Sequence, residues 1–63
     1  MYMKGKELRK IRRYLGLTQV EMAKRLGVTS NSLARWERDE VPIREVMARF
    51  IMLLRKTEQP KRR

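Results

Sequence analysis

Short runs of apolar residues at helical spacing, each closed by a glycine or followed by a proline, most constrain what this chain can fold into. The first run has apolar residues three and four positions apart, at Leu8, Ile11 and Leu15. This spacing places all three on one face of a helix. Gly16 follows directly and can take the left-handed conformation that commonly ends a helix. The pattern therefore predicts a first helix over residues 6–15, after a flexible N-terminus at residues 1–5.

The second helix is marked at both of its ends. Thr18 and Glu21 have the spacing of a capping box, in which the threonine oxygen accepts the Glu21 amide and the glutamate accepts the Thr18 amide. Gly27 is suited to end the helix. These signals predict a helix over residues 19–26.

A third helix is predicted over residues 30–38. Thr29 can cap it through its hydroxyl, and Leu33 and Trp36 give it an apolar face. Pro42 disfavours helix at the residue before it, so a loop follows the third helix.

From Ile43 onward apolar residues return at helical spacing and predict a fourth helix over residues 43–56. Residues 57–63 contain a proline and a basic end but nothing to bury, so we expect a disordered basic tail. The sequence thus predicts an all-α fold, a compact four-helix domain over residues 6–56.

The chain has 63 residues, enough for one domain that buries only about 60% of the surface its unfolded chain exposes. Cysteine and histidine are both absent, which argues against a disulfide framework, a thiolate metal site and most catalytic machinery. Glycine-rich phosphate loops are absent too. We therefore expect no enzyme activity, no metal and no cofactor.

Charge points to a polyanionic partner. Seventeen Lys and Arg residues against seven Asp and Glu residues give a formal net charge of +10. Nucleic acid is the leading candidate, although an acidic protein or an anionic membrane surface would satisfy the same charge. The longest apolar run covers residues 50–54, whereas a membrane span needs about 20 residues. With no secretory signal visible, we expect a cytoplasmic protein with no membrane partner.

The two middle helices meet the requirements of a helix-turn-helix motif. Such a motif needs a small residue where its helices cross, a turn residue that accepts positive φ and apolar residues inside its second helix. Ala23 and Gly27 supply the first two, and Leu33 and Trp36 supply the third.

Four elements stand together at fixed offsets: Leu15-Gly16-Leu17-Thr18-Gln19, Glu21-x-Ala23, Leu26-Gly27-Val28 and Trp36-Glu37. This joint pattern closely resembles the phage repressor and Cro family of helix-turn-helix domains, a lambda-repressor-like and xenobiotic-response-element-like group. The resemblance covers residues 6 to about 55. It implies a sequence-specific regulator of transcription, a repressor, that binds double-stranded DNA with helix 30–38 in the major groove. One alternative is a basic helical domain without a DNA role. Another is an antitoxin-type protein-interaction module that also regulates its own operon.

A helical wheel places Asn31 and Arg35 on the side of the third helix opposite Leu33 and Trp36. In the major groove, arginine can read guanine and asparagine can read adenine with two hydrogen bonds each. We predict a base-reading set in which Arg35 contributes most: Ser30, Asn31, Ser32 and Arg35. An ordinary solvated helix surface is the alternative. Trp36 could be a stacking platform for single strands, but its spacing from Leu33 favours core packing.

The resemblance implies that Gln19, at the start of the second helix, hydrogen-bonds a DNA phosphate beside Thr29. Alternatively, Gln19 simply suits the first turn of a helix. Arg38, Lys10 and Arg13 are further candidates for phosphate contacts, and plain solvated charges are the alternative.

Arg12 and Glu37 have a different expected role. The wheel places Glu37 on the inward side of the third helix. The resemblance implies that it forms an ion pair with Arg12 near the end of the first helix, with a structural rather than a DNA-contacting role. The alternative is an exposed pair that contributes under about 1 kcal/mol.

The fourth helix has an unusually wide apolar arc, about 160° against the roughly 100° that a helix buried on one side needs. Family members often dimerise through elements that follow the recognition helix, so we expect a homodimer through helix 43–56. The chain lacks the clear fifth helix of longer family members. A thin core that uses the whole arc is the alternative. No small-molecule ligand is expected.

Overall fold

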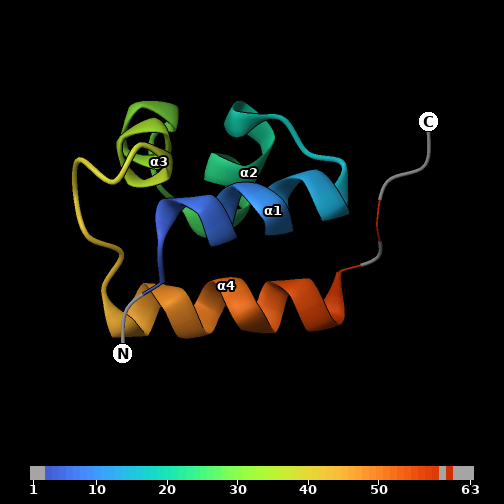
Figure 1. The fold of residues 1–63 in the computed structure, drawn as a ribbon. Helices are drawn as coiled ribbons and strands as arrows, with labels where there is room; N and C mark the ends of the chain where they lie inside the picture. The colour runs from blue at the N-terminus through green and yellow to red at the C-terminus, as the bar shows by residue number, and fades with distance from the viewer. Residues whose placement is uncertain (1–2, 59, 61–63) are drawn as a thin grey trace.

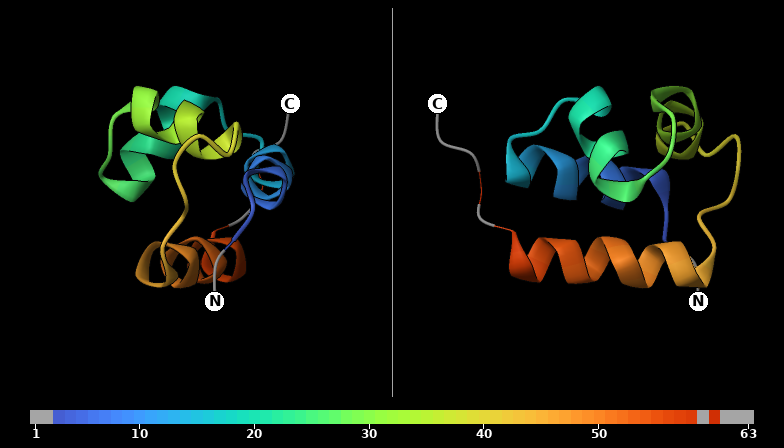
Figure 2. Two further views of the ribbon diagram at one scale, coloured as in Figure 1. Left: turned by 60° about the vertical axis from the view of Figure 1, so that its left-hand side comes forward. Right: turned by 180° about the vertical axis from the view of Figure 1, so that it is seen from behind.

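The computed structural model describes residues 3–58 and 60. These residues form an all-α arrangement of four helices, α1 (Gly5–Leu15), α2 (Gln19–Leu26), α3 (Ser30–Glu37) and α4 (Glu45–Thr57). Helix α1 lies between α4 on one side and the α2–α3 pair on the other (Figures 1 and 2). The predicted all-α, four-helix fold class is confirmed.

Local capping explains why the first two helices end where they do. Gly16 and Gly27 both adopt left-handed backbone conformations, with φ of 71° and 74°. At the start of α2, Thr18 Oγ1 accepts the Glu21 amide at 3.1 Å, and Glu21 Oε1 accepts the Thr18 amide at 2.9 Å. The capping box is therefore complete, and it fixes where the chain enters α2.

Helix α3 ends at Glu37, one residue before the sequence-based boundary at 38. Arg38 caps the helix, and Asp39 follows with φ of 60°, in the left-handed region. The Asp39 amide donates to the Trp36 carbonyl at 3.1 Å, and the Glu40 amide donates to the Arg35 carbonyl at 3.0 Å. The chain turns back on itself here because these bonds replace the helical pattern.

Residues 3–5, which the sequence assigns to a flexible N-terminus, are packed against the fold. Met3 is buried, pairs with Ile43 in an isolated antiparallel bridge, and precedes Gly5, which is the buried first residue of α1. Burial of the methionine side chain and the bridge hold this segment against the fold. Residues 1–2 lie outside the described residues.

The fourth helix begins later and ends later than predicted. Ile43 is 1% exposed and uses its backbone in the bridge to Met3, so α4 begins only at Glu45. Thr57, assigned to the tail from the sequence, is helical, and its hydroxyl donates to the Leu53 carbonyl at 3.0 Å. Most of the tail, residues 59 and 61–63, lies outside the described residues.

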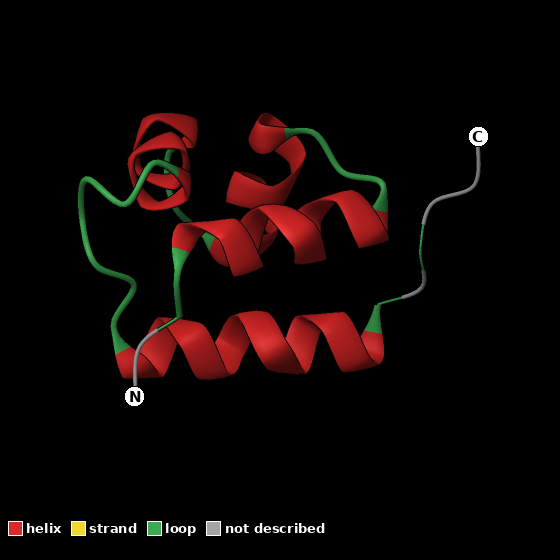
Figure 3. Cartoon of the chain, viewed as in Figure 1, coloured by secondary structure: helices red, strands yellow, loops and turns green. Residues whose placement is uncertain are grey.

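Helix α1 stands between α4 and the α2–α3 pair (Figure 3) and contributes Leu8, Ile11 and Leu15 to the core. The fully buried large side chains of the core come from every helix and from the segment before α4: Leu8, Leu15, Met22, Leu33, Ile43 and Ile51. Each such side chain contributes roughly 1.5–3 kcal/mol relative to an exposed one. Trp36 packs against this core, as its spacing from Leu33 predicts.

The N-terminus of α1 abuts the C-terminus of α3. A Cβ added at Gly5 would lie 2.3 Å from the Trp36 carbonyl oxygen and 2.5 Å from the Glu37 carbonyl oxygen. The Gly5 amide donates to Asp39 Oδ1 at 2.8 Å. Only glycine allows this approach, which positions α3 relative to α1.

Candidate nucleic-acid interface

Helices α2 and α3 are joined by residues 27–29 and pack closely together. Ala23 is 2% exposed at their contact, and its carbonyl accepts the Val28 amide at 3.0 Å. A small buried residue and a left-handed glycine thus produce the turn in the way that the sequence indicates. The turn sets the direction in which α3 presents its outer face.

The outer face of α3 carries an exposed polar stripe. Leu33 is fully buried on the inner side, whereas Asn31 and Arg35 are exposed one turn apart. Arg38 continues the same line just after the helix ends, and Ser30 is exposed in the first turn. A helix held by its inner side and open along this stripe can enter a groove that is wide enough for a helix.

Ser32 and Thr29 differ from the other predicted contact residues because they hydrogen-bond each other. Thr29 Oγ1 accepts the Ser32 amide at 3.2 Å and donates to Ser32 Oγ at 3.1 Å. Ser32 is half-buried. Both hydroxyls therefore serve the N-terminal cap of α3, and Ser32 retains one donor proton.

Glu37 joins α1 to α3 through Arg12. Arg12 Nε donates to Glu37 Oε2 at 2.6 Å, and Arg12 Nη2 donates to Oε1 at 3.2 Å. Arg12 Nη1 also donates to the Leu17 carbonyl at 3.0 Å. The side chains of Arg12 and Glu37 are 15% and 1% exposed. The structure therefore contains the pair that the resemblance implies, in a buried, two-pronged geometry and not as an exposed pair.

Two further side chains converge on the same carboxylate. Gln19 Nε2 donates to Glu37 Oε1 at 3.1 Å, and Arg9 Nε lies 3.6 Å from that oxygen. One proton of the Gln19 side-chain amide is thus bonded to Glu37 within the protein, and the second proton remains for another acceptor. Sequence reasoning missed Arg9, although its three-residue spacing from Arg12 places both on neighbouring parts of one helix face.

The Glu37 carboxyl is charged in this setting. Burial raises its pKa, but hydrogen bonds from Arg12 and Gln19 and the charges of Arg12 and Arg9 outweigh burial, so the pKa lies below its ordinary value of 4.5. A charged carboxylate can accept hydrogen bonds from all of these donors at once. This holds α1, α2 and α3 in fixed positions relative to one another.

Arg38 has an acidic partner that sequence reasoning missed. Its Nε lies 2.7 Å from Glu40 Oε2, with the two side chains 55% and 51% exposed. The hydrogen bond and the charge of Arg38 lower the pKa of Glu40, and the charge of Arg35 contributes in the same direction. The two-residue spacing of Arg38 and Glu40 across the turn is the sequence feature that could have indicated this ion pair.

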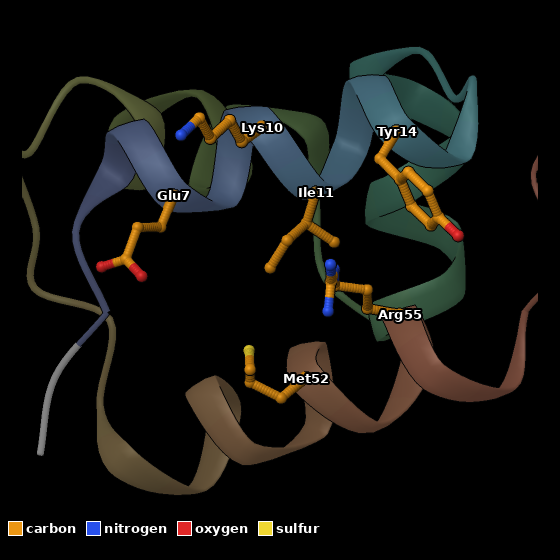
Figure 4. A pocket seen from close by; sticks show the side chains of 6 residues that line it. All are labelled: Glu7, Lys10, Ile11, Tyr14, Met52 and Arg55. Carbon is orange, nitrogen blue, oxygen red and sulfur yellow. The ribbon is translucent and has the colours of Figure 1, made fainter.

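Lys10 and Arg13 are on α1 and are not part of the exposed polar stripe of α3. Lys10 borders a groove between α1 and α4, together with Tyr14, Met52 and Arg55 (Figure 4). The Arg55 guanidinium lies 5.4 Å from the centre of the Tyr14 ring. Lys10 therefore lies on the part of α1 that borders this groove, about 100° around the helix from Arg9, which faces Glu37 of α3. Arg13 is exposed on α1.

Two negative findings concern residues 3–58 and 60. Among them, no three His, Cys, Asp or Glu side chains gather where they could hold a metal ion. None of the helices in this part of the chain has the length and apolar character needed to cross a membrane.

Comparison with known proteins places this geometry in a family context. A family model described as a helix-turn-helix domain matches residues 5–62, which include all four helices. The search of curated proteins and the search of solved structures each gave no match.

Proposed function

The chain belongs to the helix-turn-helix domain family, and we propose that it is a sequence-specific regulator of transcription that binds double-stranded DNA and acts as a repressor. The observation that carries this proposal is the exposed stripe on α3, where Asn31 and Arg35 stand one turn apart on a helix anchored by Leu33. A protein seated on a promoter can block transcription by occupancy alone, which favours repression.

In this proposal Arg35 reads a guanine and Asn31 reads an adenine through the major groove. Each two-pronged contact discriminates against a wrong base by about 1–3 kcal/mol. Ser30 is exposed in the first turn and supplies a shorter contact, while Ser32 contributes only its remaining hydroxyl proton. Arg35 is the main determinant because its guanidinium has the longest reach.

Phosphate contacts position α3 on the duplex. Gln19 offers the amide proton that Glu37 does not hold, at the first residue of α2, where the helix dipole favours an anion. Thr29, Arg38 and Arg13 complete the proposed phosphate set. Lys10, which borders the groove between α1 and α4, is a further candidate for a phosphate contact and adds long-range attraction to the duplex.

We further propose a homodimer formed through α4. Ile51 and Leu54 fill the core from one side of this helix, while Val46, Phe50 and Leu53 remain 82%, 38% and 55% exposed on its other side. The apolar arc is therefore only partly used within one chain. A two-fold dimer would place two α3 helices in successive major grooves, about 34 Å apart.

Selection of bound sequences from random duplexes tests the function. We expect wild-type protein to enrich a palindrome whose half-sites lie one helical turn apart, and we expect the enrichment to survive a fourfold increase in salt. Arg25→Ala is a suitable control, since Arg25 pairs with Glu58 at 3.2 Å and is not part of the α3 stripe. This variant should select the same sequence. Weak, salt-sensitive binding without any enriched sequence would contradict the proposal.

A further inference from the structure

An acidic side chain lies at the end of the helix that is proposed to read DNA. Glu40 Oε2 is 2.7 Å from Arg38 Nε, and both side chains are about half exposed, at 51% and 55%. The charge of Arg35 also acts on this carboxylate. Glu40 therefore lies beside Arg38, an arginine of the proposed interface, where DNA would bring a phosphate.

The turn that carries Glu40 is fixed at several points. The Glu40 amide donates to the Arg35 carbonyl at 3.0 Å, and the Asp39 amide donates to the Trp36 carbonyl at 3.1 Å. Asp39 Oδ1 in turn accepts the Gly5 amide at 2.8 Å, which ties the turn to α1. These bonds fix the backbone from which the Glu40 side chain reaches Arg38.

We propose that Glu40 competes with DNA phosphate for the Arg38 guanidinium, and that it thereby limits the affinity of the protein for DNA of any sequence. This inference rests on the proposed function. A carboxylate and a phosphate bind arginine through the same kind of charge-assisted hydrogen bond, so Arg38 cannot use the same donor for both. Contact with a phosphate therefore requires Arg38 to give up its bond to Glu40.

The consequence is a weaker background of sequence-independent binding. A chain with a net charge of +10 is attracted to every duplex, and phosphate contacts carry no sequence information. Genomic DNA offers a vast excess of competing sites. Holding one guanidinium in an internal ion pair lowers this background while Arg35 and Asn31 remain open to the bases.

Glu40→Gln tests the inference, with Glu45→Gln as a matched control. Glu45 pairs with Arg49 at 2.7 Å, its side chain is 52% exposed, and it lies on α4, across α1 from α3. Both substitutions raise the net charge by one. Binding to a labelled random duplex is measured across a range of salt concentrations. The protein concentration is chosen so that sedimentation shows the same mass for all variants.

We expect Glu40→Gln to bind about two- to fivefold more tightly at low salt. The slope of log affinity against log salt should become more negative by up to about 0.9, the value reached when Arg38 contacts a phosphate fully only after Glu40 is removed. Glu45→Gln should behave as wild type. In an Arg38→Gln background, Glu40→Gln should lose its gain, because the guanidinium that it releases is absent.

Three results would overturn the inference. Equal effects of Glu40→Gln and Glu45→Gln on DNA affinity would show that the position of Glu40 beside Arg38 has no effect on binding. A full gain in the Arg38→Gln background would show that Glu40 repels DNA directly and does not compete for Arg38. Both results leave the proposed function standing. Failure of every variant, wild type included, to bind any duplex would instead remove the proposed function and this inference together.

Discussion

Arg12 Nε donates to Glu37 Oε2 across 2.6 Å, and this bond connects the first helix to the helix that carries the proposed base-reading residues. Gln19, the first residue of α2, reaches the same carboxylate at 3.1 Å. Three helices thus meet at one buried charge. The orientation of α3 depends on this network as well as on the apolar core.

Removing the carboxylate charge should destabilise the fold. Glu37→Gln leaves the largely buried Arg12 guanidinium without its counter-ion, and we expect the free energy of unfolding to fall by about 2–3 kcal/mol. Urea denaturation monitored by circular dichroism measures the change. Glu45→Gln, which breaks only an exposed pair, should cost less than about 1 kcal/mol. Equal losses for the two variants would show that the buried network contributes no more than a surface pair.

Stability should depend on pH through the same residue. The pKa of Glu37 is lower in the folded state than its ordinary value of 4.5, so its stabilising effect is present above about that pH and is lost as the pH falls through the folded-state pKa. Urea denaturation between about pH 6 and pH 3 should show wild-type stability decreasing. Glu37→Gln should show a shallower decrease over the same interval. Parallel curves for the two proteins would contradict the assignment.

Two glycines allow steric crowding to be separated from backbone strain. Gly5→Ala would place a Cβ 2.3 Å from the Trp36 carbonyl oxygen, a backbone atom that cannot easily move. We expect a loss of about 3 kcal/mol, more than the roughly 1 kcal/mol that alanine gains as a helix former. Gly27→Ala meets no atom within 4 Å but must hold φ near 74°, which costs roughly 1–2 kcal/mol. Thermal unfolding of both variants should rank Gly5→Ala as the less stable. The reverse order would show that α1 and α3 are not held at this contact.

The proposed dimer predicts that a charge on the outer face of α4 separates the subunits without unfolding them. Val46 is 82% exposed, so Val46→Lys should leave the helical content unchanged and shift sedimentation toward the monomer. Val20→Lys provides the same substitution on α2, at a residue that is 53% exposed, and should leave the dimer intact. Identical sedimentation of both variants and wild type would remove α4 as the dimer interface.

Local signals account for the part of the fold that could be predicted. The limits of α2 follow from the Thr18–Glu21 capping box and Gly27, whose effects act within a few residues. The inward position of Glu37 follows from helical periodicity, and the resemblance supplies Arg12 as its partner. These features require no knowledge of how distant segments meet.

Contacts between distant segments account for most of the differences. Periodicity extends the fourth helix back to residue 43, but Ile43 pairs with Met3, forty positions away, and starts the helix later. Gln19 turns toward Glu37, eighteen positions away, because the fold brings a strong acceptor to it. The Arg38–Glu40 pair is local, yet it depends on the left-handed turn at Asp39, where residue type alone gives no clear signal.

The central claim is that Arg35 reads a base, and a thermodynamic cycle between this residue and the base tests it most directly. The affinity of wild type and Arg35→Ala is measured for the selected duplex and for duplexes with one base pair replaced at each position. We expect wild type to lose about 1–3 kcal/mol at one guanine position, at which Arg35→Ala loses almost nothing further, while both proteins respond equally elsewhere. If Arg35→Ala weakens binding uniformly and remains as sensitive as wild type at every position, Arg35 is only a source of charge and the account of base reading by α3 is wrong.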